Sequence, residues 1–456
     1  MLRGDWKRGK RLDRTQIIEI ARWFEKQKIP FYLNVGKHAM LFFRLETLEQ
    51  VMGVAGNTCR GFVIDEDNYT RTTYWDKLLR ELDRLLARMK AHGNKKLIMN
   101  EYRGFWHRGL LEDRFFDTLF KPEYRGLVVP IYKPNNIKAP EMNISMLVGL
   151  WQKGIIKEWG VGIYADTWKW GPVFVEAPPD IHLRLALVAA SLGGNYVVVA
   201  KNLTWNKGHV DFAPRFRPYF HSLFDLMRTG VVEPVQSPKD LCVSKVSLWE
   251  AGSTREISMR EEGTQVYWQK IFQLKGWHDT GFFLQATRDG YLSSQYYKSP
   301  HYYDMLFPVN PYGFVPLMPY VNSTKGMTKD VYWLVSGETL CRCSKDKREK
   351  LISSGSIKNA IISEASALPF RTADVFCSAV RTSYGYLIYL INPLVFEARD
   401  LGTTVTANNL GGKWTMVDAI SGTRVPCENS RCNLTVPAGL FRILKVELDQ
   451  TEYNNR

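Results

Sequence analysis

The sequence predicts an α/β protein, with a (β/α)8-type barrel over residues 1–330 and an antiparallel β-sandwich over residues 331–456. Up to about residue 210, short apolar runs alternate with helical patterns, as in parallel strands with helices outside. Most apolar runs end in polar and aromatic residues, which favours a barrel over an open sheet. After residue 330 helical periodicity nearly vanishes, and short strands are divided by Gly, Asn and Ser turns. A chain of 456 residues also exceeds what one core usually supports.

The first half supplies about six strand–helix units. A first helix is expected over 14–28, because Ile17, Ala21 and Phe24 recur at helical spacing. The clearest helix, 74–92, carries Trp, Leu and Met side chains on one face and charged residues on the other. The expected strands are 29–35, 60–64, 96–99, 126–132, 159–165 and 195–200, and the remaining helices are 107–121, 141–153 and 180–192.

An eight-unit barrel needs more strands than these six. Either the first unit is missing from this N-terminus, so that the barrel is truncated there, or the closing strands are less regular. Residues 312–320 are a candidate for a late strand end.

The second half is predicted to contain short antiparallel strands only. Cys427 and Cys432 flank a short polar turn, so we expect them to bridge a hairpin if the protein folds in an oxidising compartment. The expected strands are 331–335, 375–380, 385–391, 403–406, 414–417 and 440–448.

The chain is strongly basic, with a formal net charge of +15. Its Lys and Arg residues are nevertheless spread along the whole chain, and no zinc-finger or aromatic RNA-binding signature occurs. We therefore expect no nucleic-acid partner, and a nucleic-acid-binding protein stays open only because of the charge. The basic surface is either simply solvated or attracts an acidic or sulfated polysaccharide.

The sequence predicts neither a cofactor nor a metal ion. No G-x-G-x-x-G follows a strand, no C-x-x-C pair occurs among the seven Cys, and no two His stand at i, i+4. The longest apolar stretch, 384–396, is too short and interrupted to span a bilayer, so no membrane association is expected. The N-terminus lacks the apolar core of a signal peptide, and we expect a monomer.

Five Asn-x-Ser/Thr triplets match the signal for N-linked glycosylation, but they are weak evidence for it, since such triplets arise by chance. Those at the predicted strand ends would place a glycan where it obstructs a cleft. The five begin at Asn68, Asn143, Asn202, Asn322 and Asn433.

The polar residues that end the strands are the candidate functional residues. Parallel strands of a barrel gather their C-terminal ends on one face, where active sites form. Indoles stack on pyranose rings, and amides and lysines bind hydroxyls, so this mixture is typical of a sugar-cleaving cleft. Core filling is the alternative for most aromatic residues, and pairing with the acids is the alternative for the lysines. The predicted substrate-binding residues are Asn34, His38, Asp65, Asn100, Trp106, Lys133, Tyr164, Trp168, Trp170, Lys201 and Trp205.

Glycoside hydrolysis needs two carboxyl groups on opposite sides of the scissile bond. The candidates are the acids that end strands, Asp65, Glu66, Asp67, Glu101, Asp166 and Glu176, and three of them are predicted to be catalytic. Glu66 lies among three consecutive acids, and like charges raise one another's pKa, as a general acid needs; the alternative is an N-cap cluster. Asp166 is the only acid at its strand end and is bracketed by aromatic residues; a helix cap is its alternative. Glu101 follows Asn100, as in many retaining glycosidases, and a structural pair with a nearby arginine is its alternative.

The chain resembles glycoside hydrolase family 98, whose members are endo-acting β-galactosidases and xylanases. The resemblance spans roughly residues 30–320, and the terminal sandwich is consistent with it. It is carried by four stretches, 61–75 (GFVIDEDNYTRTTYW), 142–170, 184–199 (RLALVAASLGGNYVVV) and 312–319 (YGFVPLMP).

This resemblance implies an inverting reaction with Glu66 as the general acid and Asp166 as one base. It also implies a second base after the strand that ends at residue 200, where this chain has Lys201 and the next acid is Asp211. Family members are usually secreted, so an extracellular location is expected. The chain is thus predicted to cleave internal bonds of a xylan- or galactan-type glycan. The alternative is a carbohydrate-binding protein on the same scaffold, inactive because of Lys201.

Overall fold

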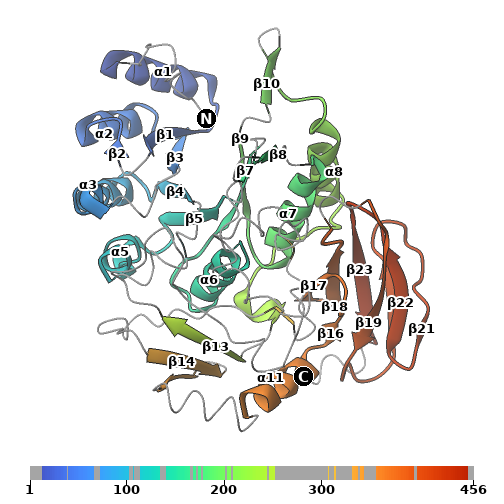
Figure 1. Ribbon diagram of the computed structural model, residues 1–456. Helices are drawn as coiled ribbons and strands as arrows, with labels where there is room; N and C mark the ends of the chain where they lie inside the picture. Colours follow the sequence, from blue (N-terminus) through green and yellow to red (C-terminus); the bar gives the residue numbers. More distant parts are fainter. Residues whose placement is uncertain are drawn as a thin grey trace.

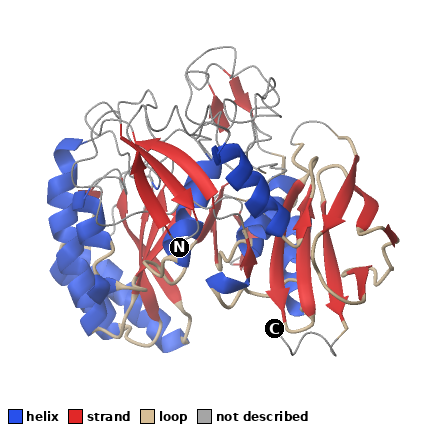
Figure 2. Ribbon diagram, turned by 90° about the horizontal axis from the view of Figure 1, so that it is seen from below, coloured by secondary structure: helices blue, strands red, loops and turns tan. Residues whose placement is uncertain are grey.

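The structure is a computed structural model, and its parallel sheet lies beside an antiparallel sandwich (Figure 1). Helices line the outer side of the parallel strands, and the sandwich lies at the opposite side of the molecule (Figure 2). The residues described are 13–37, 40–65, 72–101, 106, 113–133, 140–164, 168–170, 173–175, 178–200, 203–206, 209–243, 246–251, 307, 313–314, 331–336, 339–343, 356–394 and 398–449.

The first half alternates strand and helix as the sequence predicts. Its parallel strands neighbour one another in chain order, and a helix follows each of the first five. A short antiparallel strand, β2 (Met40–Leu41), extends the sheet beyond the first strand. The parallel strands are β1 (Phe31–Lys37), β3 (Cys59–Asp65), β4 (Lys96–Glu101), β5 (Val128–Tyr132), β6 (Gly160–Tyr164) and β9 (Tyr196–Ala200). The helices are α1 (Arg14–Gln27), α2 (Leu45–Val54), α3 (Thr72–Ala91), α5 (Asp113–Leu119), α6 (Pro140–Gln152) and α7 (Asp180–Ser191).

The helices cover the sheet by the apolar stripes that the sequence shows. In α3, Leu78, Leu82 and Leu86 are buried at successive turns, as their spacing predicts. Helix α1 begins at a capping box, in which the Asp13 carboxylate accepts from the backbone N–H of Gln16. Helix α2 has no counterpart among the predicted elements. This helix spans ten residues and buries one face, which includes Leu48, Val51 and Met52.

The sheet curves so far that its outer parallel strands approach each other. Tyr32 of β1 and Tyr196 of β9 both pack against one inner apolar cluster, and burial raises the pKa of both phenols. Val63, Ile98 and Val129 form a separate apolar cluster on the concave side, between these two tyrosines. Within the described residues no backbone ladder joins β9 to β1, so the curved parallel sheet is established and a closed barrel is not.

Two glycines allow neighbouring strands to approach closely. A Cβ on Gly61 would overlap the carbonyl of Lys96 in the next strand, and one on Gly160 would overlap that of Tyr196. Gly61 also has a φ of +146°, which side chains rarely adopt. Both glycines therefore let the sheet form its curved parallel pairs.

The second half has antiparallel sheets, as predicted, but it also contains helix α11 (Ser356–Ala367), which has no counterpart among the predicted elements. Its five-stranded sheet places one face against the helices of the first half and the other against the sandwich core, so β18 is buried throughout. This sheet has the order β12 (Leu241–Cys242), β17 (Phe376–Thr382), β18 (Gly385–Ile391), β23 (Phe441–Leu448) and β20 (Trp414–Asp418). The facing sheet has the order β16 (Phe370–Arg371), β19 (Leu401–Ala407), β22 (Arg431–Val436) and β21 (Cys427–Glu428).

Strands from both sides of residue 330 share sheets. Strand β12 pairs with β17, and β13 (Val246–Ala251) pairs with β14 (Val331–Ser336). Segments before residue 330 therefore contribute strands to sheets that also contain residues after 330. Among the described residues, no helix combines the length and the apolar character that a membrane span requires.

The remaining elements in the described part of the chain are two hairpins, three strands, two helices and two 3-10 turns. The hairpins are β7 (Trp168–Trp170)–β8 (Val173–Val175) and β10 (Leu203–Asn206)–β11 (His209–Phe212), and the strands are β13 (Val246–Ala251), β14 (Val331–Ser336) and β15 (Thr339–Cys343). The helices are α8 (Arg217–Arg228) and α11 (Ser356–Ala367), and the 3-10 turns are Pro122–Tyr124 and Pro238–Asp240.

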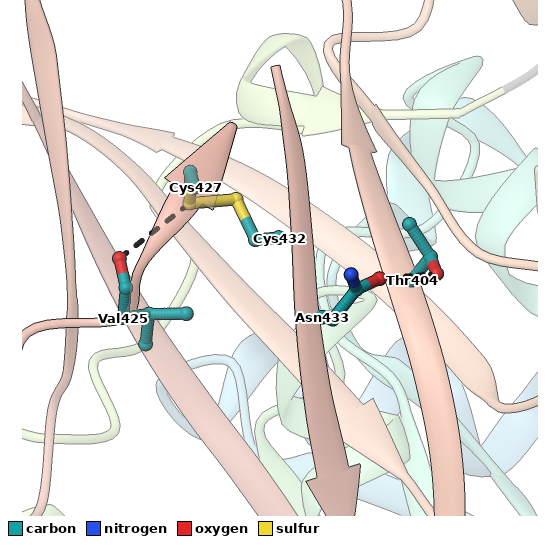
Figure 3. Close-up of a disulfide and its surroundings, with 5 residues drawn as sticks. All are labelled: Thr404, Val425, Cys427, Cys432 and Asn433. Atoms are coloured by element: carbon teal, nitrogen blue, oxygen red, sulfur yellow. Dashed lines mark hydrogen bonds between the residues drawn. A yellow bond between two sulfur atoms is a disulfide. The ribbon is translucent and has the colours of Figure 1, made fainter. Parts of the chain in front are cut away.

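A disulfide joins Cys427 of β21 to Cys432 of β22 (Figure 3). The two residues are also paired in the β21–β22 ladder, so the bond bridges a hairpin as the sequence predicts. By contrast Cys59, Cys242 and Cys377 are thiols, and burial raises the pKa of Cys59 and Cys242 to about 11. Such thiols are mostly protonated at neutral pH.

Candidate functional site

A buried polar layer lies at the C-terminal ends of three adjacent parallel strands. Asp65 ends β3, Asn100 is the penultimate residue of β4, and Lys133 follows β5 directly. All three side chains are 0% exposed. Asp65 and Asn100 are direct neighbours in the β3–β4 register, so the layer follows from the parallel pairing of strands with polar ends.

Asp65 is the centre of this layer. Its Oδ1 accepts a hydrogen bond of 2.9 Å from Nδ2 of Asn100, and it lies 3.5 Å from Nζ of Lys133. A buried carboxylate costs several kcal/mol unless it is paired, and here both a cation and an amide compensate it. Lys133 thus pairs with an acid, and its predicted role in binding substrate stays a prediction. We call Asp65, Asn100 and Lys133 the polar triad.

The polar triad lies on the concave side of the sheet. Side chains alternate along a strand, and Val63, Ile98 and Ile131 of the inner apolar cluster each stand two residues before a member of the triad. The triad thus forms the next layer up, at the C-terminal edge, inside the curve of the sheet. A ligand-binding site in a curved parallel sheet forms at this edge.

Asn34 adds a buried acceptor to the same concave side. It is paired in register with Val63, and its side chain is only 8% exposed. Among the residues that the structure describes, its Oδ1 has no hydrogen-bond partner. Since buried polar atoms are nearly always paired, this amide oxygen is available to a hydroxyl donor from a ligand.

Glu101 belongs to the other side of the sheet. It is paired in register with Tyr132, and Leu97, Met99 and Tyr132 all belong to the core cluster that includes the helix side chains. The backbone carbonyl of Glu101 accepts from the N–H of Lys133 at 2.8 Å, which fixes the end of β4 to the end of β5. Alternation therefore separates Asn100, on the concave side, from Glu101, on the helix side.

Trp106 is fully buried, and its Nε1 donates to the carbonyl of Ile131 at 2.9 Å. The indole thus packs within the core below the strand ends, and its predicted role in stacking a sugar stays a prediction. Of the other predicted site residues, Tyr164 ends β6, Trp168 and Trp170 lie in β7, and Trp205 lies in β10. Four lie outside the described residues: His38, Glu66, Asp166 and Lys201.

Sequence reasoning missed the Tyr32–Tyr196 pair, whose rings pack against the same inner apolar cluster from β1 and β9. Both tyrosines stand near the starts of predicted strands, but nothing in the sequence connects residues so far apart. No cluster of three or more His, Cys, Asp or Glu side chains arranged for a metal ion occurs in the described part of the chain.

Of the comparisons with known proteins, only the one with solved structures finds similar proteins. No protein-family model matches the chain, and no curated protein does. The chain is similar to the catalytic module of a family 98 glycoside hydrolase from Streptococcus pneumoniae TIGR4, with 12% identity over 94% of this chain and 87% of that chain and a TM-score of 0.47. The resemblance drawn from the sequence is thus found again among solved structures.

Two further similar structures are also glycoside hydrolases by their descriptions. An alpha-L-fucosidase isoenzyme 2 from Paenibacillus thiaminolyticus has 9% identity over 96% of this chain and 80% of that chain, with a TM-score of 0.41. An Anoxybacillus alpha-amylase has 8% identity over 89% of this chain and 62% of that chain, with a TM-score of 0.32.

Proposed function

We propose that this chain is a glycoside hydrolase whose active site lies at the C-terminal edge of the curved sheet. The observation that carries the proposal is the polar triad, a buried and compensated layer on the concave side, with the acceptor of Asn34 beside it. Such a layer offers fixed hydrogen-bonding groups inside a concave scaffold, where a hydroxyl-rich ligand can be oriented.

In this proposal the polar triad is the floor of the site and the catalytic acids come from the chain that follows the strands. Glu66 directly follows Asp65, and Asp166 is the second residue after β6. Glu66 is the general acid that protonates the leaving oxygen, and Asp166 is the base that activates water. The reaction is inverting, which requires a separation of about 6.5–9.5 Å between the two carboxyl groups. The substrate is a xylan- or galactan-type glycan, and the bond that is cleaved is an internal one.

The test is the release of reducing ends from xylan, galactan and sulfated galactan by the purified chain. Glu66→Gln and Asp166→Asn should each lower the rate by about 10²–10⁴-fold, because each removes a proton-transfer group. Asp374→Asn, which changes an exposed acid of the sandwich, is the matched control and should act like the wild type. Full activity in both site variants would contradict the assignment of these acids.

The second candidate is a carbohydrate-binding protein without catalysis. It is favoured by Lys201, which stands where the family resemblance implies a second base. Saturable binding of one of these glycans without any release of reducing ends would support this candidate over the hydrolase. If release occurs, NMR detection of the first-formed anomer decides between inversion and retention.

A further inference from the structure

A polar groove lies on the outer face of the sandwich, far along the chain from the proposed active site. Its volume is about 460 Å³, and it is formed by Asp374, residues 402–404 of β19 and residues 433–435 of β22. The proposed hydrolase activity uses none of these residues. We call this feature the sandwich groove.

Strand β22 presents an Asn-Leu-Thr triplet to this groove. Asn433 and Thr435 are exposed, whereas Cys432 and Val436 are buried in the sandwich core. Because side chains alternate along a strand, Asn433 and Thr435 lie on the same, outer face. The triplet is the acceptor signal for N-linked glycosylation, and among the five triplets of this chain it is the one whose Asn side chain the structure describes.

The side-chain amide of Asn433 is held through its oxygen. Its Oδ1 accepts a hydrogen bond of 2.7 Å from the Thr404 hydroxyl on the neighbouring strand. Figure 3 shows this oxygen turned toward Thr404 and Nδ2 turned away from it. A glycan is attached through Nδ2, so the bond to Thr404 is kept after modification and holds the amide in place.

The groove also has room for the first sugar. Gly402 lies opposite Thr435 in the β19–β22 register, and a Cβ added there would meet no atom within 4 Å. The threonine, asparagine and aspartate groups that line the groove can hydrogen-bond the hydroxyls of that sugar. Disulfides form in oxidising compartments, of which the endoplasmic reticulum is one, so the Cys427–Cys432 bond of this hairpin is consistent with folding there.

We propose that Asn433 is an N-glycosylation site whose first sugar residue occupies the sandwich groove. The donor is an oligosaccharide linked to a polyprenyl pyrophosphate. Nδ2 of Asn433 forms a bond to C1 of the terminal sugar, the bond between C1 and the phosphate oxygen breaks, and the lipid pyrophosphate leaves with the electron pair. The amide loses one proton. The modification is independent of the proposed hydrolase activity.

To test this proposal, the full chain is expressed with a secretion leader in a eukaryotic host. Peptides from the secreted and the retained protein are then analysed together by mass spectrometry. The peptide that contains Asn433 should carry an N-glycan, which peptide N-glycosidase removes while converting Asn433 to aspartate. Asn433→Gln and Thr435→Ala should abolish this glycan. Thr435→Ser, which keeps the hydroxyl, and Thr404→Val, which leaves the triplet intact, should retain it.

The disulfide provides an internal control in the same hairpin. A peptide with the Cys427–Cys432 bond formed has passed through an oxidising compartment. If such peptides carry only unmodified Asn433, the proposal is overturned. Glycans at other triplets, with Asn433 unmodified, also overturn it.

Discussion

At the scale of single residues, Lys133 decides whether the polar triad is stable. Its ammonium group is fully buried and lies 3.5 Å from the equally buried carboxylate of Asp65. Removal of one partner from a buried ion pair leaves an uncompensated charge, whereas removal of both charges does not. The pair is therefore expected to show strong energetic coupling.

Lys133→Met should lower the free energy of unfolding by about 3–5 kcal/mol, because Asp65 loses its cation. The double variant Lys133→Met/Asp65→Asn should recover most of that loss, since the amide is neutral. Urea unfolding of the wild type, both single variants and the double variant measures the coupling. Lys77→Met, at an exposed position of α3, is the control. Additive effects of the two single substitutions would show that the pair is not coupled.

At the scale of elements, Glu25 fastens α1 to the turn that enters β3. Its carboxylate accepts hydrogen bonds from the Thr58 hydroxyl at 2.7 Å, from the Thr58 N–H at 3.1 Å and from Nδ2 of Asn57 at 2.9 Å. These bonds favour the charged form. The side-chain bond from Thr58, followed by that from Asn57, lowers the pKa of Glu25 from 4.5 to about 2.

This lowered pKa predicts a pH dependence of stability. A group whose pKa falls on folding contributes stability above its unfolded pKa, and this contribution is lost as the pH falls through the folded value. Glu25 should therefore stabilise the fold fully above about pH 4.5 and progressively less toward pH 2. Glu25→Gln should unfold at lower temperature than the wild type at pH 6, and the difference should shrink toward pH 2. Glu19→Gln, at an exposed position of α1, should show no such trend.

At the scale of the whole molecule, Arg184 joins the two halves of the chain. It is fully buried in α7, and its Nη1 donates to the carbonyls of Asn392 and Leu394, at 2.7 and 2.8 Å. Its Nη2 is paired with Asp180, and Phe307 lies against the guanidinium with 4.5 Å between Cζ and the ring centroid. Helix α7 is thus fixed to the sandwich by one fully buried cation.

Arg184→Met should lower the free energy of unfolding by about 3–5 kcal/mol, because two buried carbonyls lose a charged donor and Asp180 loses its partner. Since the contact joins the two halves, calorimetry should also show that they unfold over a wider temperature range in the variant than in the wild type. Arg228→Met removes an exposed arginine that pairs with Asp225 on α8 and should change stability by less than about 1 kcal/mol. Equal effects of the two substitutions would contradict this role.

The sequence allowed the alternation of strands and helices, the strand-end polar residues and the Cys427–Cys432 hairpin to be predicted, because each depends on neighbours in the chain. The sequence predicts Asn100 and Glu101 in the same cleft, whereas consecutive residues of β4 point to opposite faces of the sheet. Which of the two faces the concave side depends on how β4 packs between β3 and β5, and local pattern does not contain that information. The packing of Tyr32 and Tyr196 against one cluster brings distant strands together and could not be predicted for the same reason.

Hydrogen–deuterium exchange with bound glycan tests most directly whether the C-terminal edge of the curved sheet is the active site. The Glu66→Gln/Asp166→Asn variant, which should bind without cleavage, is mixed with xylo- or galacto-oligosaccharide. Peptides that cover the ends of β3, β4 and β5 around the polar triad should exchange more slowly, while the starts of these strands stay unchanged. Protection confined to the sandwich, or no protection by either class of oligosaccharide, would contradict the account.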